Sequence, residues 1–326
     1  MFPLKRGFMP NWNEIFVEIQ QQQGLHQLQA LQASDVTRKK YLRELHEQTG
    51  RNVIAYYSGW LSKPGVSLSD INDEDKTGFM TTVHKLDRSL GLDLILHTPG
   101  GGIAATQSIV NYLQKMFGRD IRAFIPQIAM SAGAIMACCC KEIWMGKQSN
   151  LGPIDPQLRG IPAYGVVQEF KRALREVRKD ASRIVIWQQI IGQYRPTFLG
   201  QCENAIKWSN DFVEQQLAEG MFAQFPDGKK RAKKAVKSLS DYPSNKTHDR
   251  HFDAEECRSF GLEIKDLESN AVLQDLVLTV HHCYMILLMN SNAFKIIENH
   301  KGVAIVKNVP AFPTAPPPGQ RAEQPT

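Results

Sequence analysis

The sequence DLILHTPGGG at residues 93–102 decides the fold, together with AFIPQIAMSAGA at residues 123–134. Each segment opens with a short apolar run, which is typical of a buried strand. Each run then breaks into a turn that leads into a predicted helix. Two successive strand–turn–helix units of this kind predict a pair of turns at the carboxyl ends of their strands, where open α/β sheets carry their functional groups.

The glycines Gly100, Gly101 and Gly102 form the turn of the first unit. Pro99 ends the strand before them, because proline has no N–H to donate to a neighbouring strand. Glycines allow positive φ angles and leave room for another backbone or a ligand. The helix predicted over residues 103–117 starts directly after them, and the free N–H groups at its N-terminus suit a developing anion. Taken alone, the triplet also fits an ordinary tight turn.

Ser131 forms the turn of the second unit, where it precedes a helix predicted over residues 132–140. Nearby residues are small, namely Ala129, Ala132, Gly133 and Ala134, so its hydroxyl is not enclosed by large side chains. The simplest role for such a serine is to cap the helix. A nucleophile is favoured because the glycine turn lies one unit earlier. Backbone N–H groups of Gly100, Gly101 and Ala132 would then hold the oxyanion that forms when Ser131 attacks a carbonyl group.

Four short apolar runs predict the strands of the core: residues 52–57, 93–96, 121–125 and 142–145. Repeated strand–helix–strand crossovers imply an α/β protein with a mainly parallel sheet. Residues 161–305 are mostly helical by pattern. We expect a polar N-terminal extension over residues 1–45, one domain over residues 46–305 and a proline-rich, disordered tail over residues 306–326.

Composition fits a globular protein that works in a reducing compartment. Hydrophobic residues make up 42% and charged residues 22% of the 326 residues. The six cysteines, three of them consecutive at Cys138–Cys140, form neither a disulfide framework nor a metal-binding pair. Lys5 and Arg6 are followed by no apolar core, so no secretory signal is expected. We therefore expect a cytoplasmic location, with no metal and no organic cofactor.

Two further segments suggest surfaces for partners. The apolar stretch at residues 272–289 contains Asp275, His281 and His282, which favours a buried or subunit-interface helix over a membrane span. The net charge of +6 comes largely from the lysine-rich segment Lys229–Lys237. That segment is either a solvated helix face or a docking patch for an acidic partner.

At this point the motifs resemble the Clp protease and crotonase fold group. There, a Pro-Gly-Gly turn forms the oxyanion hole and a serine in a small-residue turn is the nucleophile. The sequence is more similar to the serine dehydrogenase proteinase family, a cytosolic relative of signal peptide peptidase A. The resemblance covers about residues 40–305, and its matching segments are residues 49–57, 92–101, 129–133, 152–157, 247–249 and 292–296.

The resemblance breaks at the general base. Clp proteases carry a histidine in a segment ending Ile-His-Gln-Pro, whereas this chain has Ile-Asp-Pro-Gln, with Asp155 in the place of the histidine. One substitute is His248, oriented by Asp155 or Asp249, because histidine titrates near neutral pH. The other is Lys171, as in the Ser-Lys dyad of signal peptide peptidase relatives. Lys171 would have to be buried to lose its proton, and arginines surround it in the sequence. We favour His248; Asp155 also suits a role in the tight turn between two prolines.

The sequence thus predicts a serine peptidase that acts on polypeptides. Two other classes stay open: a catalytically silent scaffold of the same fold that binds peptides or proteins, and a crotonase-like acyl-CoA enzyme without a nucleophilic serine. The resemblance also implies a homo-oligomer built from trimers. The apolar stretch at residues 272–289 would supply its interface unless that helix lies in the core.

Overall fold

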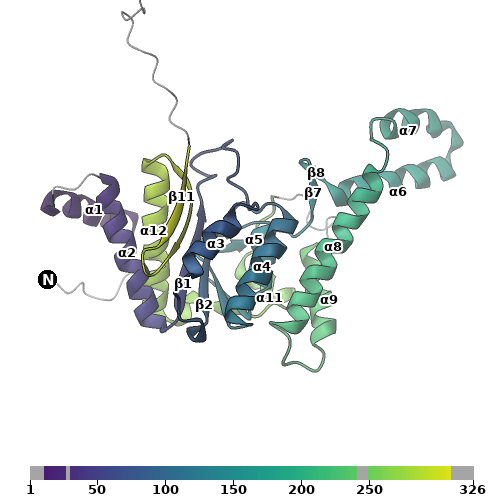
Figure 1. The fold of residues 1–326 in the computed structure, drawn as a ribbon. Helices are drawn as coiled ribbons and strands as arrows, with labels where there is room; N and C mark the ends of the chain where they lie inside the picture. The colour runs from purple at the N-terminus through teal and green to yellow at the C-terminus, as the bar shows by residue number, and fades with distance from the viewer. Residues whose placement is uncertain (1–10, 27–29, 241–248, 310–326) are drawn as a thin grey trace, which may run out of the picture.

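The computed structural model describes residues 11–26, 30–240 and 249–309. A seven-stranded sheet forms the centre, with the strand order β11-β10-β1-β2-β3-β5-β9 (Figure 1). Neighbouring strands from β1 to β9 are parallel, whereas β10 and β11 form an antiparallel edge. The strands are β1 (Asn52–Ser58), β2 (Leu92–His97), β3 (Ile121–Ile125), β5 (Glu142–Met145), β9 (Ile264–Asp266), β10 (Ala293–Asn299) and β11 (Ala304–Asn308).

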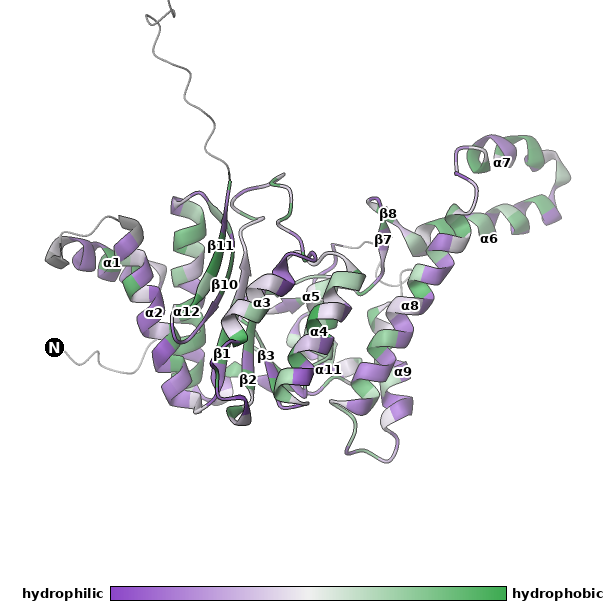
Figure 2. Ribbon diagram, in the orientation of Figure 1, coloured by the Kyte–Doolittle hydropathy of each residue, from purple (hydrophilic) through white to green (hydrophobic). Residues whose placement is uncertain are grey.

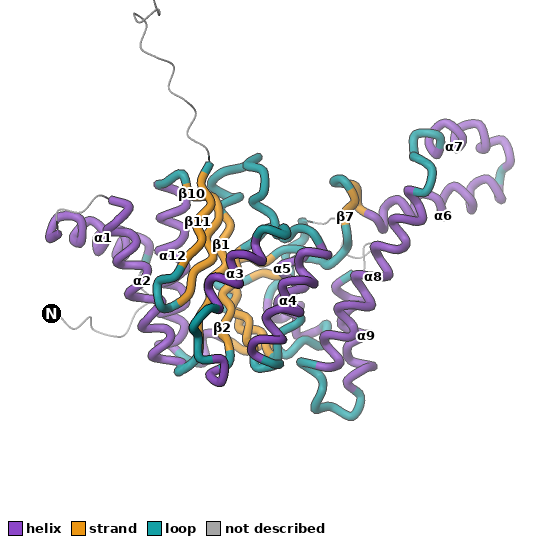
Figure 3. Tube along the Cα trace, in the orientation of Figure 1, coloured by secondary structure: helices purple, strands orange, loops and turns teal. Residues whose placement is uncertain are grey.

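Helices cover both faces of this sheet (Figure 3). Successive residues of β1 alternate between the two apolar layers, with Tyr56 on one side and Tyr57 on the other. The layer that contains Tyr56 is built from α3 (Asp75–Val83), α4 (Ile103–Phe117), α5 (Ala132–Cys138), α8 (Phe198–Glu219), α9 (Gly228–Leu239) and α11 (Ala254–Ser259). The layer that contains Tyr57 is built from α1 (Trp12–His26), α2 (Ala30–Thr49) and α12 (Ala271–Asn290). Single 3-10 turns lie at Arg88–Leu90, Ala181–Arg183 and Leu267–Ser269.

Helix α12 is the long apolar segment for which the sequence allowed either a core position or a subunit interface. It has the length and hydropathy of a membrane-spanning helix, and Figure 2 shows hydrophobic residues along it. Within the fold, 67% of its most apolar window is buried. It packs against α1, α2 and the sheet, where Tyr284 stacks on Tyr57 and donates a hydrogen bond to Glu298. These contacts place α12 in the core, so its apolar surplus gives no argument for a subunit interface.

The N-terminal segment is helical and contributes to the core. Helix α2 runs across the predicted boundary at residue 45, and its Leu42 and Leu45 are fully buried. Arg38 of α2 forms a buried ion pair with Glu298 of β10, with 2.5 Å between Nε and Oε2. The predicted start of the tail at residue 306 likewise falls inside β11.

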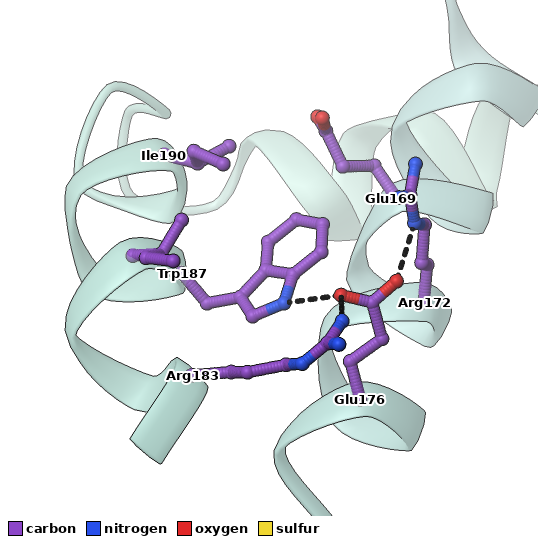
Figure 4. A pocket seen from close by; sticks show the side chains of 7 residues that line it. Glu169, Arg172, Glu176, Arg183, Trp187 and Ile190 are labelled. Carbon is purple, nitrogen blue, oxygen red and sulfur yellow. Dashed lines mark hydrogen bonds and ion pairs between the residues drawn. The ribbon is translucent and has the colours of Figure 1, made fainter. Parts of the chain in front are cut away.

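A helical arm projects from the body beyond α8 (Figure 1). It begins with the two-stranded β7 (Gln157–Leu158) and β8 (Ile161–Pro162) and continues as α6 (Ala163–Lys179) and α7 (Ile184–Ile191). A pocket of about 390 Å³ lies between α6 and α7, and Figure 4 shows Glu176 binding Arg172, Arg183 and Trp187 at its edge. None of the residues that line this pocket belongs to the glycine or serine turn.

The predicted fold class, α/β with a mainly parallel sheet, is confirmed, and all four predicted strands are present. The repeated β-β-α description stays a prediction. The prediction of a mostly helical segment up to residue 305 is wrong at its end, because β10 and β11 are strands there. Helix α9 buries Ala232, Ala235 and Leu239 and exposes its lysines, as a solvated helix face does.

Candidate active site

Ser131 lies in a sharp turn between the short strand β4 (Ile128–Ala129) and helix α5. Its φ of 48° and ψ of −115° are rare for a residue with a side chain, and such strain clusters at functional sites. Its side chain makes no capping hydrogen bond to α5. The capping role suggested for Ser131 is therefore wrong, and the strained turn has the geometry of a nucleophile elbow.

The glycine turn lies directly against the serine turn. A Cβ atom placed on Gly100 would lie 2.7 Å from Ser131 Cβ and 3.0 Å from the amide nitrogen of Ala132. On another side, a Cβ on Gly152 would lie 2.9 Å from the amide nitrogen of Ser131. Only residues without side chains fit at these two places, so glycine permits the close approach of three backbone segments around Ser131.

The register between the two turns is fixed by backbone hydrogen bonds. The Thr98 N–H donates to Ile128 O at 3.2 Å, and the Met130 N–H donates to Thr98 O at 3.0 Å. β4 also pairs in parallel with β6 (Asn150–Leu151), which leads to Gly152. The ladder therefore sets Ser131 and Gly100 at a fixed separation, as an active site built on rigid elements requires.

Ile71 holds the glycine turn from its other side. The Ile71 N–H donates to Gly100 O at 2.6 Å, and the Gly102 N–H donates to Ile71 O at 2.9 Å. Because the C=O and N–H of one trans peptide group point in opposite directions, the hydrogen bond from Ile71 to Gly100 O turns the N–H of Gly101 away from Ile71. Within the described part of the chain, neither Gly101 N–H nor Ala132 N–H donates a hydrogen bond. The Gly100 N–H is already engaged, since it donates to Thr98 Oγ1 at 3.2 Å.

Asp155 follows three residues after Gly152 in the same loop and is buried, with 2% of its surface exposed. Its loop is fixed by two hydrogen bonds of the preceding residue: the Ile154 N–H donates to Leu239 O at 3.2 Å, and Ser209 Oγ donates to Ile154 O at 3.2 Å. This anchoring of the backbone fits the structural role suggested for the turn. Asp249, by contrast, is exposed.

His248 lies outside the described residues. The segment that follows it does enter the site, because Phe252 and Leu151 exchange backbone hydrogen bonds of 2.8 and 2.9 Å. Leu151 precedes Gly152, which contacts the amide of Ser131.

Lys171 is exposed on α6, in the projecting arm. The burial that a neutral lysine base needs is absent there, so the structure gives the dyad with Lys171 no support.

The cysteines and His97 are poorly suited to catalysis because they are buried. All six cysteines are buried, and burial raises the pKa of Cys138 to about 12. Such thiols are poor nucleophiles at neutral pH. His97, the last residue of β2, is fully buried, which lowers its pKa to about 3. Among the described residues, no group of three histidine, cysteine, aspartate or glutamate side chains suits a metal ion.

Ile71 and Thr98 are the site residues that the sequence did not reveal. Ile71 acts through its backbone, so no side-chain pattern marks it. The only signal near Thr98 is the proline and glycine turn that follows it, and that turn predicts the break of the strand but not its pairing with β4.

The sequence matches a family of known proteins and two further relatives. The sequence model of the ClpP-like SDH-type serine proteinases matches residues 24–284. Two uncharacterized proteins of Methanocaldococcus jannaschii are similar to the chain. One is 27% identical over 230 residues, which cover 70% of this chain and 71% of the relative. The other is 26% identical over 234 residues, which cover 70% and 73%.

Proposed function

Because the chain belongs to the ClpP-like SDH-type serine proteinases, we propose that it hydrolyses peptide bonds through an acyl-enzyme on Ser131. One observation carries this proposal: Ser131 keeps a strained backbone at the start of a helix, against a glycine turn whose Gly101 N–H has no partner among the described residues. A serine that only capped a helix would need neither the strain nor the neighbouring glycines.

The proposed reaction has two steps. Ser131 Oγ attacks the carbonyl carbon of the substrate while a general base takes its proton, and the N–H groups of Gly101 and Ala132 stabilise the oxyanion. The C–N bond then breaks as the base returns the proton to the leaving amine. Water attacks the resulting ester with the help of the same base, which releases the acid and restores the Ser131 hydroxyl.

For the general base we propose His248, with the buried carboxyl group of Asp155 to orient it. The support is indirect and comes from the described neighbours. The bridge between Phe252 and Leu151 brings the segment after His248 to the strand that leads to Gly152, which in turn lies against the amide of Ser131. Asp155 follows three residues after Gly152 in the same buried loop. Asp249 is less suited to orient a base, since its side chain is exposed.

A serine-directed fluorophosphonate probe tests this proposal. The wild type should be labelled on one serine, and peptide mapping should identify Ser131. The Ser131→Ala variant should not be labelled and should lose turnover of any peptide that the wild type cleaves. If the folded wild type is never labelled, the scaffold or acyl-CoA alternative replaces the peptidase.

The Clp/crotonase type of fold, the trimer-based assembly, the cytoplasmic location and the acidic partner of Lys229–Lys237 remain predictions of the sequence. Assembly has a direct test in sedimentation equilibrium at micromolar concentration. A mass of three chains, or a multiple of it, is expected from the resemblance, whereas a single-chain mass that does not change on tenfold concentration would contradict it.

A further inference from the structure

A buried ion pair lies behind the glycine turn, on the side away from Ser131. Lys295 of β10 and Asp75 at the start of α3 are 1% and 0% exposed, and Lys295 Nζ lies 2.9 Å from Asp75 Oδ2. Removing two charges from water costs several kcal/mol per ion before their attraction and hydrogen bonds repay it. A buried pair is therefore weak evidence of added stability, and its role is better judged from the backbone groups that it holds in place.

The pair fixes both sides of Ile71. Lys295 Nζ donates a hydrogen bond to the backbone oxygen of Asp70 at 2.5 Å. Asp75 Oδ2 accepts a hydrogen bond from the N–H of Asn72 at 3.1 Å and another from Tyr56 Oη at 2.8 Å. Residues 70 and 72 are thus both tied to the charged pair, and the peptide groups of Ile71 between them have little freedom to shift.

Ile71 in turn determines how the glycine turn is placed. Its N–H and C=O bind Gly100 and Gly102, and a Cβ on Gly101 would lie 2.3 Å from both the nitrogen and the oxygen of Ile71. The two backbones are therefore packed too closely for either one to shift alone. A displacement of Ile71 would therefore move the Gly101 N–H, and an error of about 1 Å in a catalytic group can cost roughly 100-fold in rate.

We propose that Lys295 and Asp75 are positioning residues, which hold the Gly101 N–H in the oxyanion hole through the backbone of Ile71. The proposal rests on the proposed function of Gly101. Neither residue touches the substrate: they act only through residues 70–72 and then through the hydrogen bonds of Ile71.

The same strand offers a matched control. Glu298 of β10 pairs with Arg38 of α2 on the other face of the sheet, and both side chains are as buried as Lys295 and Asp75. That pair contacts Tyr284 of α12 and makes no hydrogen bond to residues 70–72 or to the glycine turn. Neutralising it should cost stability without moving the oxyanion donor.

The test compares two double variants, Asp75→Asn with Lys295→Met and Arg38→Met with Glu298→Gln. Each removes both charges of its buried pair, which avoids leaving one of them alone in the core and the unfolding that this causes. Lys307 of β11 also lies 3.2 Å from Asp75 Oδ1, but it is 16% exposed and keeps Glu74 as its partner in the first variant. We expect the first double variant to lose roughly 10- to 100-fold in kcat with KM changed less than about threefold, since the oxyanion donor acts on the transition state. The control should keep its kcat within about threefold. Hydrogen exchange at the amides of Ile71 and Gly102 should rise in the first variant only.

Three results would overturn the proposal: an unchanged kcat in a folded first variant, an equal loss of kcat in the control, or unchanged exchange at Ile71 and Gly102. The exchange measurement needs no activity. If the wild type neither labels nor cleaves, the proposed function fails and the catalytic part of this inference fails with it. Hydrogen exchange at Ile71 and Gly102 then still shows whether Lys295 and Asp75 hold the glycine turn. Failure of the proposed function and failure of this positioning role can therefore be told apart. Should the first variant not fold, Tyr56→Phe removes one hydrogen bond to Asp75 and should give the same changes to a smaller extent.

Discussion

A methyl group on Gly100 would lie 2.7 Å from the Cβ atom of Ser131. The glycine turn and the serine turn, which are separated in the sequence by helix α4 and strands β3 and β4, therefore form one packed unit. Real Cβ atoms almost never approach other atoms within 3.0 Å, so an L-residue at Gly100 must displace one of the two turns. The positive φ of 98° at Gly100 adds a second reason for glycine at this position.

The glycine triplet gives a graded prediction. Gly100→Ala and Gly101→Ala should each abolish most of the turnover and cost about 1–3 kcal/mol of stability, because each Cβ collides with backbone or with Ser131 at an unfavourable φ. Gly102→Ala is the matched control: its φ is −69°, and its nearest neighbour would be 3.7 Å away. Peptide turnover and urea unfolding of the three variants would check this. Equal effects at Gly102 would show that the whole turn is merely intolerant of substitution.

Strain at Ser131 predicts a conflict between stability and activity. Glycine adopts the φ of 48° without strain, whereas the same φ destabilises serine by about 1–3 kcal/mol. Ser131→Gly should therefore be inactive yet unfold at a higher urea concentration than the wild type. Ser131→Ala should be equally inactive without that gain, because alanine has the same steric conflict as serine. A loss of stability in both variants would indicate that the hydroxyl supports the fold rather than catalysis.

Burial of His97 predicts a loss of stability in acid. The pKa of His97 is about 3 in the folded protein, against an ordinary value of 6.5, so the unfolded chain takes up the proton first as pH falls. This contribution is complete above pH 6.5 and declines progressively between pH 6.5 and pH 3, by about 2 kcal/mol at pH 5. His281, whose ring centre lies 5.2 Å away, adds to the effect because burial also lowers its pKa.

Urea unfolding at pH 7.5 and pH 5 measures this loss. His97→Leu should reduce the difference between the two pH values by about 2 kcal/mol relative to the wild type. Replacement of the exposed His84 by glutamine serves as the control and should leave the difference unchanged. If His97→Leu keeps the full difference, the acid loss comes from other groups.

The parallel half of the sheet could be predicted because its strands are local apolar runs bounded by turns. Strands β3 and β5 and helix α4 have the predicted limits. The antiparallel edge could not be predicted in this way. β10 pairs with β1 through contacts such as Ile54 with Asn299, so its identity depends on partners far away in the sequence. The sequence also could not place α12, because an apolar surface on every side suits a core helix and an interface helix equally.

The serine and glycine turns were found from the sequence because small residues and glycines mark close backbone approach. The supporting residues were not, since Ile71 contributes only N–H and C=O groups, and any residue but proline has both. Lys295 and Asp75 are far apart in the sequence and resemble ordinary surface charges until the fold buries them. The strained φ of Ser131 has no sequence signal at all.

The two candidate bases give the last prediction. His248→Ala should reduce kcat by at least about 100-fold, as expected when a general base is lost, whereas Lys171→Ala should retain wild-type turnover because its side chain is exposed on the arm. Asp155→Asn should fall in between, and Asp249→Asn should have little effect, since Asp155 is buried and Asp249 is exposed. The measurement is kcat for a single peptide substrate across pH 5–9, with circular dichroism to confirm folding. A loss confined to Lys171→Ala would restore the Ser-Lys dyad and require the arm to fold onto the site of its own or a neighbouring subunit.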